Sequence, residues 1–132
     1  MDRLFLDANV LFSAVWREKS GLLRLWKLPG AELVSSAYAV DEARRNLSDS
    51  EARARLETLL GETTLVAEGS LAELPPNLTL ASKDRPILAA AIHAGATHLL
   101  TGDRRDFGKL FGRRFGGVLI LRPAEYLTSR KR

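Results

Sequence analysis

LFLDANVL, residues 4–11, is a short apolar run that ends at Asp7 and leads directly into a helical pattern. Three consecutive apolar residues favour a strand that is buried on both faces, as in a parallel sheet. A second run of this kind, THLLTGD at 97–103, ends at Asp103. The carboxyl ends of parallel strands meet at one edge of an open α/β sheet, so we expect these two acids to lie close together.

Strand and helix patterns alternate along almost the whole chain. Strands are predicted at 4–6, 32–35, 63–66, 97–100 and 118–121. Helices are predicted at 10–28 with a break at Gly21, from residue 36 to about 47, at 48–60, at 87–94 and from residue 123 onward, with a loop at 68–79. This alternation indicates an α/β fold with a central, mostly parallel sheet and helices on both faces. We expect a single domain at 1–128 and a frayed basic tail at 129–132.

Local signals predict several helix ends. Ser36 is a suitable N-cap for the helix that follows it. Ser48 and Glu51 have the spacing of a capping box, and Gly61 fits the C′ position of the same helix. Pro86 is tolerated in a first helical turn, so a helix is expected to begin close to it.

Composition restricts the class of protein. The chain has 132 residues, of which 45% are hydrophobic and 27% charged, and these values suit one folded domain with its own core. The absence of cysteine excludes disulfides, zinc–thiolate sites and thiol nucleophiles, and it suits a reducing cytoplasm. The start, MDRLFLDANVLF, does not resemble a signal peptide, and no apolar stretch approaches the roughly 20 residues that span a bilayer. We therefore expect a soluble, cytoplasmic protein without a membrane partner.

Charge and missing motifs restrict the function. The formal net charge is +4 and the pI is about 9.8. A basic surface around an acidic pocket suits a polyanionic substrate, although a modest positive charge is equally explained by solubility alone. The chain has no P-loop, GxGxxG or nucleophile-elbow motif, which argues against nucleotide hydrolases, dinucleotide enzymes and serine hydrolases.

Four acids that are far apart in sequence, Asp7, Glu42, Asp84 and Asp103, each follow an apolar run or stand near a helix start. If the fold gathers them, they cannot all stay ionised in a dry site unless a hard cation such as Mg²⁺ or Mn²⁺ neutralises them. The pattern therefore predicts a divalent-metal enzyme. Taken singly, Asp7 and Asp84 are also explained as helix caps, and Glu42 as an acid placed favourably near a helix N-terminus.

Accessory polar residues accompany these acids. Asn9 is placed to orient Asp7 through its amide, Ser13 is one helical turn further along, and the Thr101 hydroxyl is expected to be free for water or phosphate. His93 and His98 have no metal-ligand spacing and are predicted to be ordinary helix-surface and strand residues.

The order of these motifs resembles the PIN-domain nucleases, and within them the VapC-like toxins of toxin–antitoxin pairs. The motifs are LDANVLFSA at 6–14, an acid on a helix near residue 42, Asp84 before PILAAAIHAGATHLL, and TGDRRDF at 101–107. The resemblance implies a PIN-like three-layer sandwich and metal-dependent cleavage of single-stranded RNA. By position, the acidic quartet corresponds to Asp7, Glu42, Asp84 and Asp103, and a common accessory acid corresponds to Asp106.

The resemblance also implies an RNA substrate and an antitoxin partner, and it leaves a homodimer open. Asp7 and Asp103 are the strongest candidates for metal ligands, with the other three acids completing the site. Lys83 and Arg85 flank Asp84 where relatives often have further acids, which predicts weaker metal binding or a contact to phosphate. Two alternatives are a DNA- or RNA-processing nuclease of the same fold and a catalytically weak PIN module that binds RNA or protein.

The densest basic stretch of the chain is the predicted phosphate-binding element. It contains Arg104, Arg105, Lys109, Arg113 and Arg114. A solvated surface helix explains the same stretch equally well.

Overall fold

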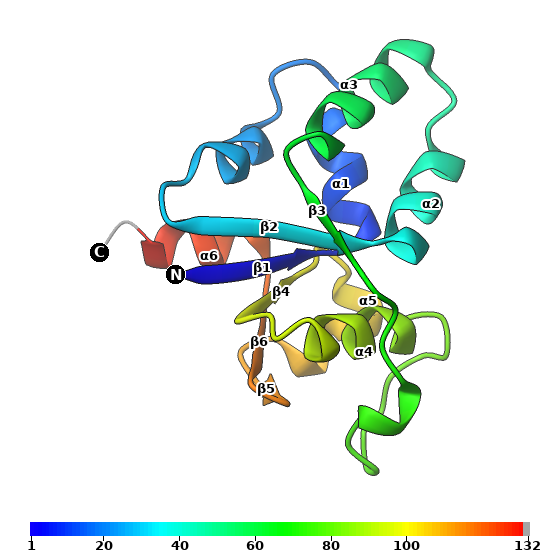
Figure 1. Cartoon of the computed structure of the whole chain (residues 1–132), viewed down its shortest axis with the longest axis vertical. Helices are drawn as coiled ribbons and strands as arrows, with labels where there is room; N and C mark the ends of the chain where they lie inside the picture. Colours follow the sequence, from blue (N-terminus) through cyan, green and yellow to red (C-terminus); the bar gives the residue numbers. More distant parts are fainter. Residues whose placement is uncertain (131–132) are drawn as a thin grey trace.

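β1 (Asp2–Leu6) lies inside the sheet because its apolar run packs on both faces: Leu4, Phe5 and Leu6 are fully buried. The computed structural model describes residues 1–130 (Figure 1). The other strands are β2 (Ala31–Ser36), β3 (Thr64–Val66), β4 (His98–Leu100), β5 (Arg114–Phe115) and β6 (Val118–Leu121). The α-helices are α1 (Ala8–Val15), α2 (Ala37–Asn46), α3 (Ser50–Leu60), α4 (Arg85–His93), α5 (Arg104–Phe107) and α6 (Pro123–Arg130), and the 3₁₀ helices are η1 (Gly21–Lys27), η2 (Leu71–Glu73) and η3 (Gly108–Leu110).

The strand order is β3-β2-β1-β4-β6-β5, and every pairing is parallel except that of β5 with β6. The chain fills one half of the sheet from β1 outward and then returns to place β4 on the other side of β1. The order therefore reverses between β1 and β4, and ligands of open α/β sheets bind outside the carboxyl ends of the strands at such a point. The backbone N–H of Asp7 donates to the carbonyl of Leu100 at 3.1 Å, which joins the ends of these two strands.

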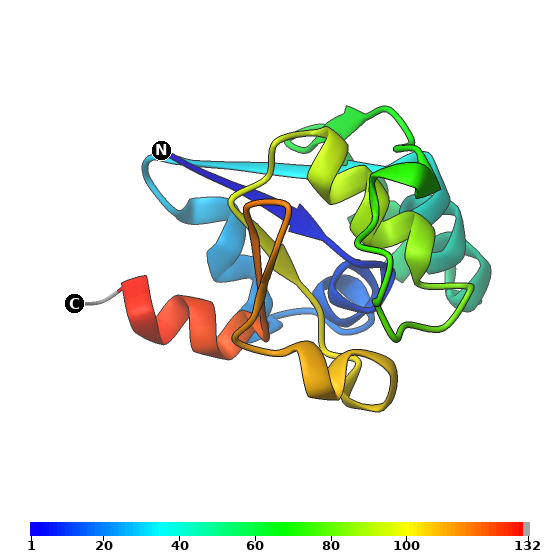
Figure 2. The same ribbon diagram turned by 90° about the horizontal axis from the view of Figure 1, so that it is seen from below.

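Helices cover both faces of the sheet, as the sequence predicted. On one face, Leu4 and Leu6 pack with buried residues of α1, α3 and α6, whereas on the other Phe5 and Leu99 pack with α4. Figure 1 shows α1 and α3 above the sheet and α4 and α5 below it. In the view from below in Figure 2, β1 runs from the N-terminus toward the end of the sheet where α5 lies. In residues 1–130, no helix is long and apolar enough to cross a membrane.

The helical segment predicted at 10–28 is two helices. α1 ends at Val15, and the backbone turns left-handed at Lys19, with φ 77°, before Ser20 caps η1. The break therefore lies before Gly21 rather than at it. Within η1, Leu25 is buried.

Both ends of α3 differ from the sequence prediction. The prediction of a capping box at Ser48 is wrong, because the Asp49 carboxylate caps the helix by accepting the Ala52 N–H at 3.1 Å. A charged carboxylate accepts this hydrogen bond more strongly than a hydroxyl and also favours the positive end of the helix dipole. Gly61 is the C-cap of the helix, with φ −64°, and not the C′ residue that was predicted.

Four short elements fall outside the predicted strands and helices: η2, α5, η3 and β5. η2 interrupts the loop at 68–79, and β5 forms a hairpin with β6 through Gly116 and Gly117, whose φ values are 55° and 84°. Adjacent glycines with positive φ are the usual signal for such a turn. The boundary predicted at residue 128 falls inside α6, because Ser129 and Arg130 continue that helix, and residues 131–132 lie outside the described part of the chain.

Candidate active site

Asp7 is buried at the point where β1 passes into α1, with 3% of its surface exposed. One carboxylate oxygen accepts the backbone N–H of Ala8 at 2.7 Å. The other accepts the Thr101 hydroxyl at 2.8 Å and the Asn9 amide at 3.3 Å. Asp7 is therefore both the cap of α1 and a rigidly oriented acid, and Asn9 makes the orienting contact expected from the sequence.

Thr101 joins the two halves of the site. Its buried hydroxyl donates to Asp7 and accepts hydrogen bonds from the Asn9 amide at 3.2 Å and the Asp103 N–H at 3.1 Å. The expectation that this hydroxyl is free for water or phosphate was wrong, because all its hydrogen-bonding capacity is used inside the protein. Asn9 also accepts the Gly102 N–H at 2.8 Å, which fixes the turn after β4 against α1.

Asp103 caps the short helix α5. Its Oδ1 accepts the backbone N–H groups of Arg105 at 3.1 Å and Asp106 at 3.0 Å. Asp103 lines the same cavity as Asp7.

Asp84 stands at the N-cap position of α4, yet its side chain makes no capping hydrogen bond. It is 7% exposed, and among the described residues its Oδ2 is the buried side-chain oxygen without a hydrogen-bond partner. An unpaired buried carboxylate oxygen is costly, so it is most simply explained by a ligand. The cap explanation considered for this residue is therefore insufficient.

Asp106 and Lys83 form an ion pair next to Asp84 and Asp103. The Lys83 ammonium lies 3.1 Å from Asp106 Oδ2. Single carboxylate oxygens of Asp84, Asp103 and Asp106 lie within 4.8 Å of one another. The ion pair between Lys83 and Asp106 stabilises the charged forms of both residues, because contact with Lys83 lowers the pKa of Asp106 and contact with Asp106 raises the pKa of Lys83.

The four acids of the predicted quartet border one cavity of about 620 Å³, which we call the acidic cavity. Three of the predicted quartet face it from the sheet edge and α4, and Glu42 reaches it from α2. It is lined by Asp7, Ala8, Asn9, Phe12, Ser13, Glu42, Asn46, Lys83, Asp84, Gly102 and Asp103. The fold thus brings together all four predicted acids, with Asn9 and Ser13, and holds Asp106 beside them through Lys83.

Burial makes ionisation of two of these acids unfavourable. Removal from water is the main reason that the pKa of Asp7 is raised to about 6, and the negative charges of Glu42 and Asp103 raise it further, against the lowering effect of the Thr101 hydrogen bond. Burial likewise raises the pKa of Asp84 to about 7, followed by its contact with Asp106. Such pKa values are common at functional sites, where the charge of a ligand offsets the penalty.

The donor set fits a hard divalent cation. Mg²⁺ and Mn²⁺ prefer carboxylate oxygens, and the site offers several of these together with the unpaired Oδ2 of Asp84. A cation would supply the positive charge that the raised pKa values of Asp7 and Asp84 call for. The closely spaced cluster is Asp84, Asp103 and Asp106, and Asp7 and Glu42 line the acidic cavity together with Asp84 and Asp103.

The predicted phosphate-binding residues are divided between two places. Arg104, Arg105 and Lys109 line a second cavity of about 860 Å³ beside α5, the α5 cavity, which Arg85 and Asp106 also border. Arg113 instead lies over the ring of Phe115 at 5.4 Å, and Arg114 is on β5 at the sheet edge. Only the first group adjoins the acids.

The flanking residues of Asp84 have different roles. Lys83 lines the acidic cavity, whereas the Arg85 guanidinium donates to the carbonyls of Leu80 and Leu78, both at 3.0 Å. The histidines take no part in the site: His93 contacts Glu73 on the surface, and His98 packs edge-on against Tyr126.

Sequence reasoning missed two residues that line the acidic cavity. Asn46 lies one turn after Glu42 and donates to its carbonyl at 3.1 Å, and Phe12 lies one turn after Ala8. Helical spacing from the predicted acids is the signal that identifies both.

Comparison with known proteins assigns the family. The profile of the PIN domain family matches residues 3–105, so the chain belongs to the PIN domain family, as the sequence resemblance indicated. Membership implies nuclease activity. No curated protein matches the chain.

Two solved structures share the fold. One is a chain of VapBC2 from Rickettsia felis, in a complex bound to a DNA fragment from their promoter, with a TM-score of 0.66 and 14% identity over 91% of this chain and 98% of that chain. The other is a chain of VapBC-1 from nontypeable Haemophilus influenzae, with a TM-score of 0.56 and 14% identity over 92% of this chain and 98% of that chain. At this identity the likeness establishes the fold, and it confirms the predicted α/β architecture.

The raised pKa of Asp84 predicts a pH-dependent stability in the absence of metal. Because the folded state holds this proton more tightly, stability is lost as pH rises from the ordinary pKa of 3.8 through about 7. Asp84→Asn removes the penalty, and its amide is able to donate to Asp106. We expect a gain of at least about 1 kcal/mol at pH 8 and little change at pH 4, since a tenfold difference in proton affinity corresponds to about 1.4 kcal/mol.

The measurement is urea unfolding in EDTA at both pH values. Asp41→Asn is the matched control, because this acid is exposed on α2 and does not line the acidic cavity. Equal stability changes at the two pH values would contradict a raised pKa at Asp84.

Proposed function

We propose that this protein is a Mg²⁺- or Mn²⁺-dependent endoribonuclease that cleaves single-stranded RNA, and that it is the toxin of a toxin–antitoxin pair. The observation that carries the proposal is the buried, unpaired Oδ2 of Asp84 in a cavity shared with Asp7, Glu42 and Asp103. The resemblance of this protein's fold to chains of two VapBC complexes supports a protein partner. We place the activity in the cytoplasm, where such a substrate is found.

A bound divalent cation would supply activation of water and stabilisation of the charge that develops on the phosphate. Asp84 and Asp103 would hold it with Asp7, while Asn9 and Thr101 keep the Asp7 carboxylate in one orientation. Hydrogen bonds of this kind, made to a ligand rather than to the cation, maintain ligand geometry and ligand basicity.

Other residues of the cavity would act on the substrate directly. Glu42 reaches the cavity from α2, outside the closely spaced cluster, and would take a proton from the attacking water. Lys83 stays protonated beside Asp106 and offers a positive charge to a phosphate oxygen. The α5 cavity continues this positive path through Arg104, Arg105 and Lys109.

A processing nuclease of the same fold is the main alternative within the family, and a catalytically weak binding module is the other. The complete set of acids around one cavity favours an active enzyme over a binding module.

The first test is cleavage of a mixed RNA pool with Mg²⁺, Mn²⁺ or EDTA. We expect cleavage with either cation and none in EDTA. Asp103→Asn and Asp84→Asn are expected to reduce the rate at least about a hundredfold, because the amide keeps the shape but removes a charge that holds the cation. Asp41→Asn should retain the wild-type rate. Full activity in EDTA, or in either site variant, would exclude the proposed centre.

The second test separates the two groups of arginines. Neutralising Arg104 and Arg105 to Gln should weaken RNA binding and make its salt dependence shallower by about 0.7 for each phosphate that the variant no longer binds. The matched double variant at Arg113 and Arg114 changes the net charge equally but lies away from the acids. Equal effects of the two pairs would mean that net charge, rather than the α5 cavity, determines binding.

The third test concerns the biological role. Expression of the active protein in a bacterial host should arrest growth, and Asp103→Asn should abolish the arrest because it removes cleavage without disturbing the core. Co-expression of the neighbouring-gene partner should restore growth. Normal growth with strong expression of cleavage-competent protein would favour the processing nuclease.

A further inference from the structure

Two aromatic side chains, the partly buried Phe12 and the exposed Trp16, lie one turn apart at the end of α1. Phe12 lines the acidic cavity, and Trp16 is 59% exposed. The two rings are nearly parallel, with an interplanar angle of 14° and centroids 6.2 Å apart. A single exposed aromatic residue is ordinary, but here the exposed ring extends a stack that begins inside the candidate active site.

A small basic cavity lies beside this pair. It has a volume of about 330 Å³, and we call it the α1 cavity. Ser13 lines both this cavity and the acidic cavity, so the two lie next to each other. Among the described residues that line the α1 cavity, Arg17 and Arg24 are charged, and none is acidic.

Hydrogen bonds to the backbone fix the end of α1, where Trp16 lies. The backbone N–H of Trp16 donates to the Phe12 carbonyl at 2.9 Å, and the side chain of Arg55 on α3 donates to the Val15 carbonyl at 2.9 Å. The left-handed turn at Lys19 then directs the chain back so that Arg24 of η1 faces the same cavity as Arg17. An ordered aromatic surface loses little entropy when a ligand stacks on it.

We propose that Phe12 and Trp16 form a stacking platform for an unpaired RNA base, while Arg17 and Arg24 hold the phosphate next to it. This inference deepens the proposed function, on which it rests, by defining a nucleotide subsite beside the scissile phosphodiester. Aromatic side chains beside a positive groove are the common means of binding single strands, because every base has a flat face.

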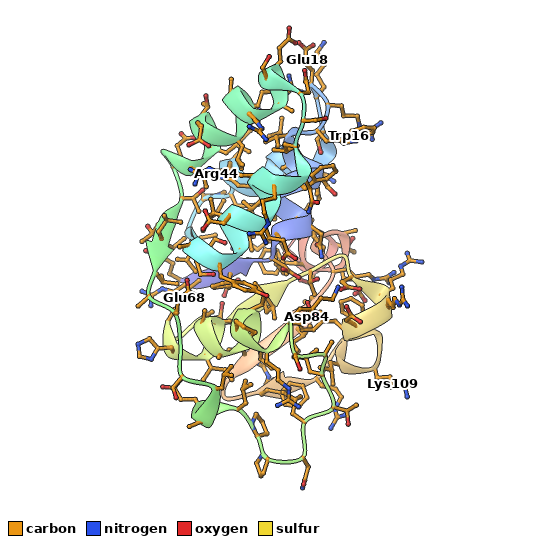
Figure 3. All side chains as sticks on the ribbon, turned by 90° about the vertical axis from the view of Figure 1, so that its right-hand side faces the viewer. Trp16, Glu18, Arg44, Glu68, Asp84 and Lys109 are labelled. Atoms are coloured by element: carbon orange, nitrogen blue, oxygen red, sulfur yellow. The ribbon has the colours of Figure 1, made fainter. Side chains whose placement is uncertain are left out.

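The position of the platform agrees with a single strand that passes over the acids. Figure 3, which views the right-hand side of Figure 1, shows Trp16 above Asp84 and Lys109 below it. Basic cavities therefore lie on two sides of the acidic cavity, the α1 cavity toward Trp16 and the α5 cavity toward Lys109. A strand held at both would place a phosphate between them, over the carboxylates. The acidic groups of a peptide would also pair with the arginines. They do not stack on the exposed face of Trp16 as a nucleic-acid base does.

The test is the fluorescence and affinity of the full chain with unpaired oligouridine RNA in EDTA, where binding is measured without turnover. Trp16→Ala should raise Kd at least about tenfold, equivalent to about 1.4 kcal/mol, whereas Trp16→Phe should stay within about threefold because it keeps a ring. Wild-type fluorescence should be quenched by the RNA. That response should vanish in Trp16→Phe, which leaves Trp26, bonded to Thr63, as the only tryptophan.

Two controls separate stacking from charge and from general surface effects. Inorganic polyphosphate has the charge but no base, so it should compete for the arginines without quenching Trp16. Leu71→Ala removes an equally exposed apolar side chain, 56% exposed on η2, and should bind RNA as the wild type does.

The outcomes distinguish this subsite from the nuclease proposal. RNA binding that is unchanged in Trp16→Ala would overturn the subsite, and this is the result expected if a protein covers the platform instead. Quenching by polyphosphate equal to that by RNA would overturn it too, while metal-dependent cleavage would still support the nuclease. Base-dependent quenching and weakened binding without cleavage would support the subsite and contradict the nuclease.

Discussion

The hydrogen bond from the Asp7 N–H to the Leu100 carbonyl, 3.1 Å long, joins the carboxyl ends of β1 and β4 where the strand order reverses. Both acid-bearing turns begin at this junction. Thr101 then bridges them by donating to Asp7 and accepting from the Asp103 N–H. The fold therefore holds two carboxylates near each other before any ligand is present. The pKa of Asp7 is raised, mainly because the side chain is buried and further because Glu42 and Asp103 are negatively charged.

This arrangement lowers the stability of the folded state but holds the carboxylates in position for a ligand. Buried acids with raised pKa values weaken a protein at neutral pH unless a cation compensates them. The remaining core offsets that cost, since α4 has five consecutive buried residues, from Ile87 to Ala91, between the sheet and the segments that cover it. Rigid strands and helix caps, rather than loops alone, position the carboxylates, and this arrangement suits a reaction that depends on exact placement.

Much of this arrangement was predictable from the sequence, for identifiable physical reasons. Apolar runs ending in acids identified β1 and β4, and the rule for parallel sheets predicted that Asp7 and Asp103 converge. The Thr101 hydroxyl was assigned wrongly, because a sequence does not reveal which of several nearby acceptors a hydroxyl will choose. Arg113 and Arg114 seemed continuous with Arg104 and Arg105, but a two-residue strand at 114–115 carries them to the sheet edge.

Whether these carboxylates hold a divalent cation is tested by thermal unfolding of the wild type with Mn²⁺ or Mg²⁺ and with EDTA at pH 7.5. We expect that either cation raises the unfolding temperature, that EDTA reverses the rise, and that Asp103→Asn removes it while Asp41→Asn keeps it. The cation would stabilise the folded state by mass action, since the unfolded chain lacks the site. The same rise in Asp103→Asn, or no rise in the wild type, would contradict a cation site at these acids.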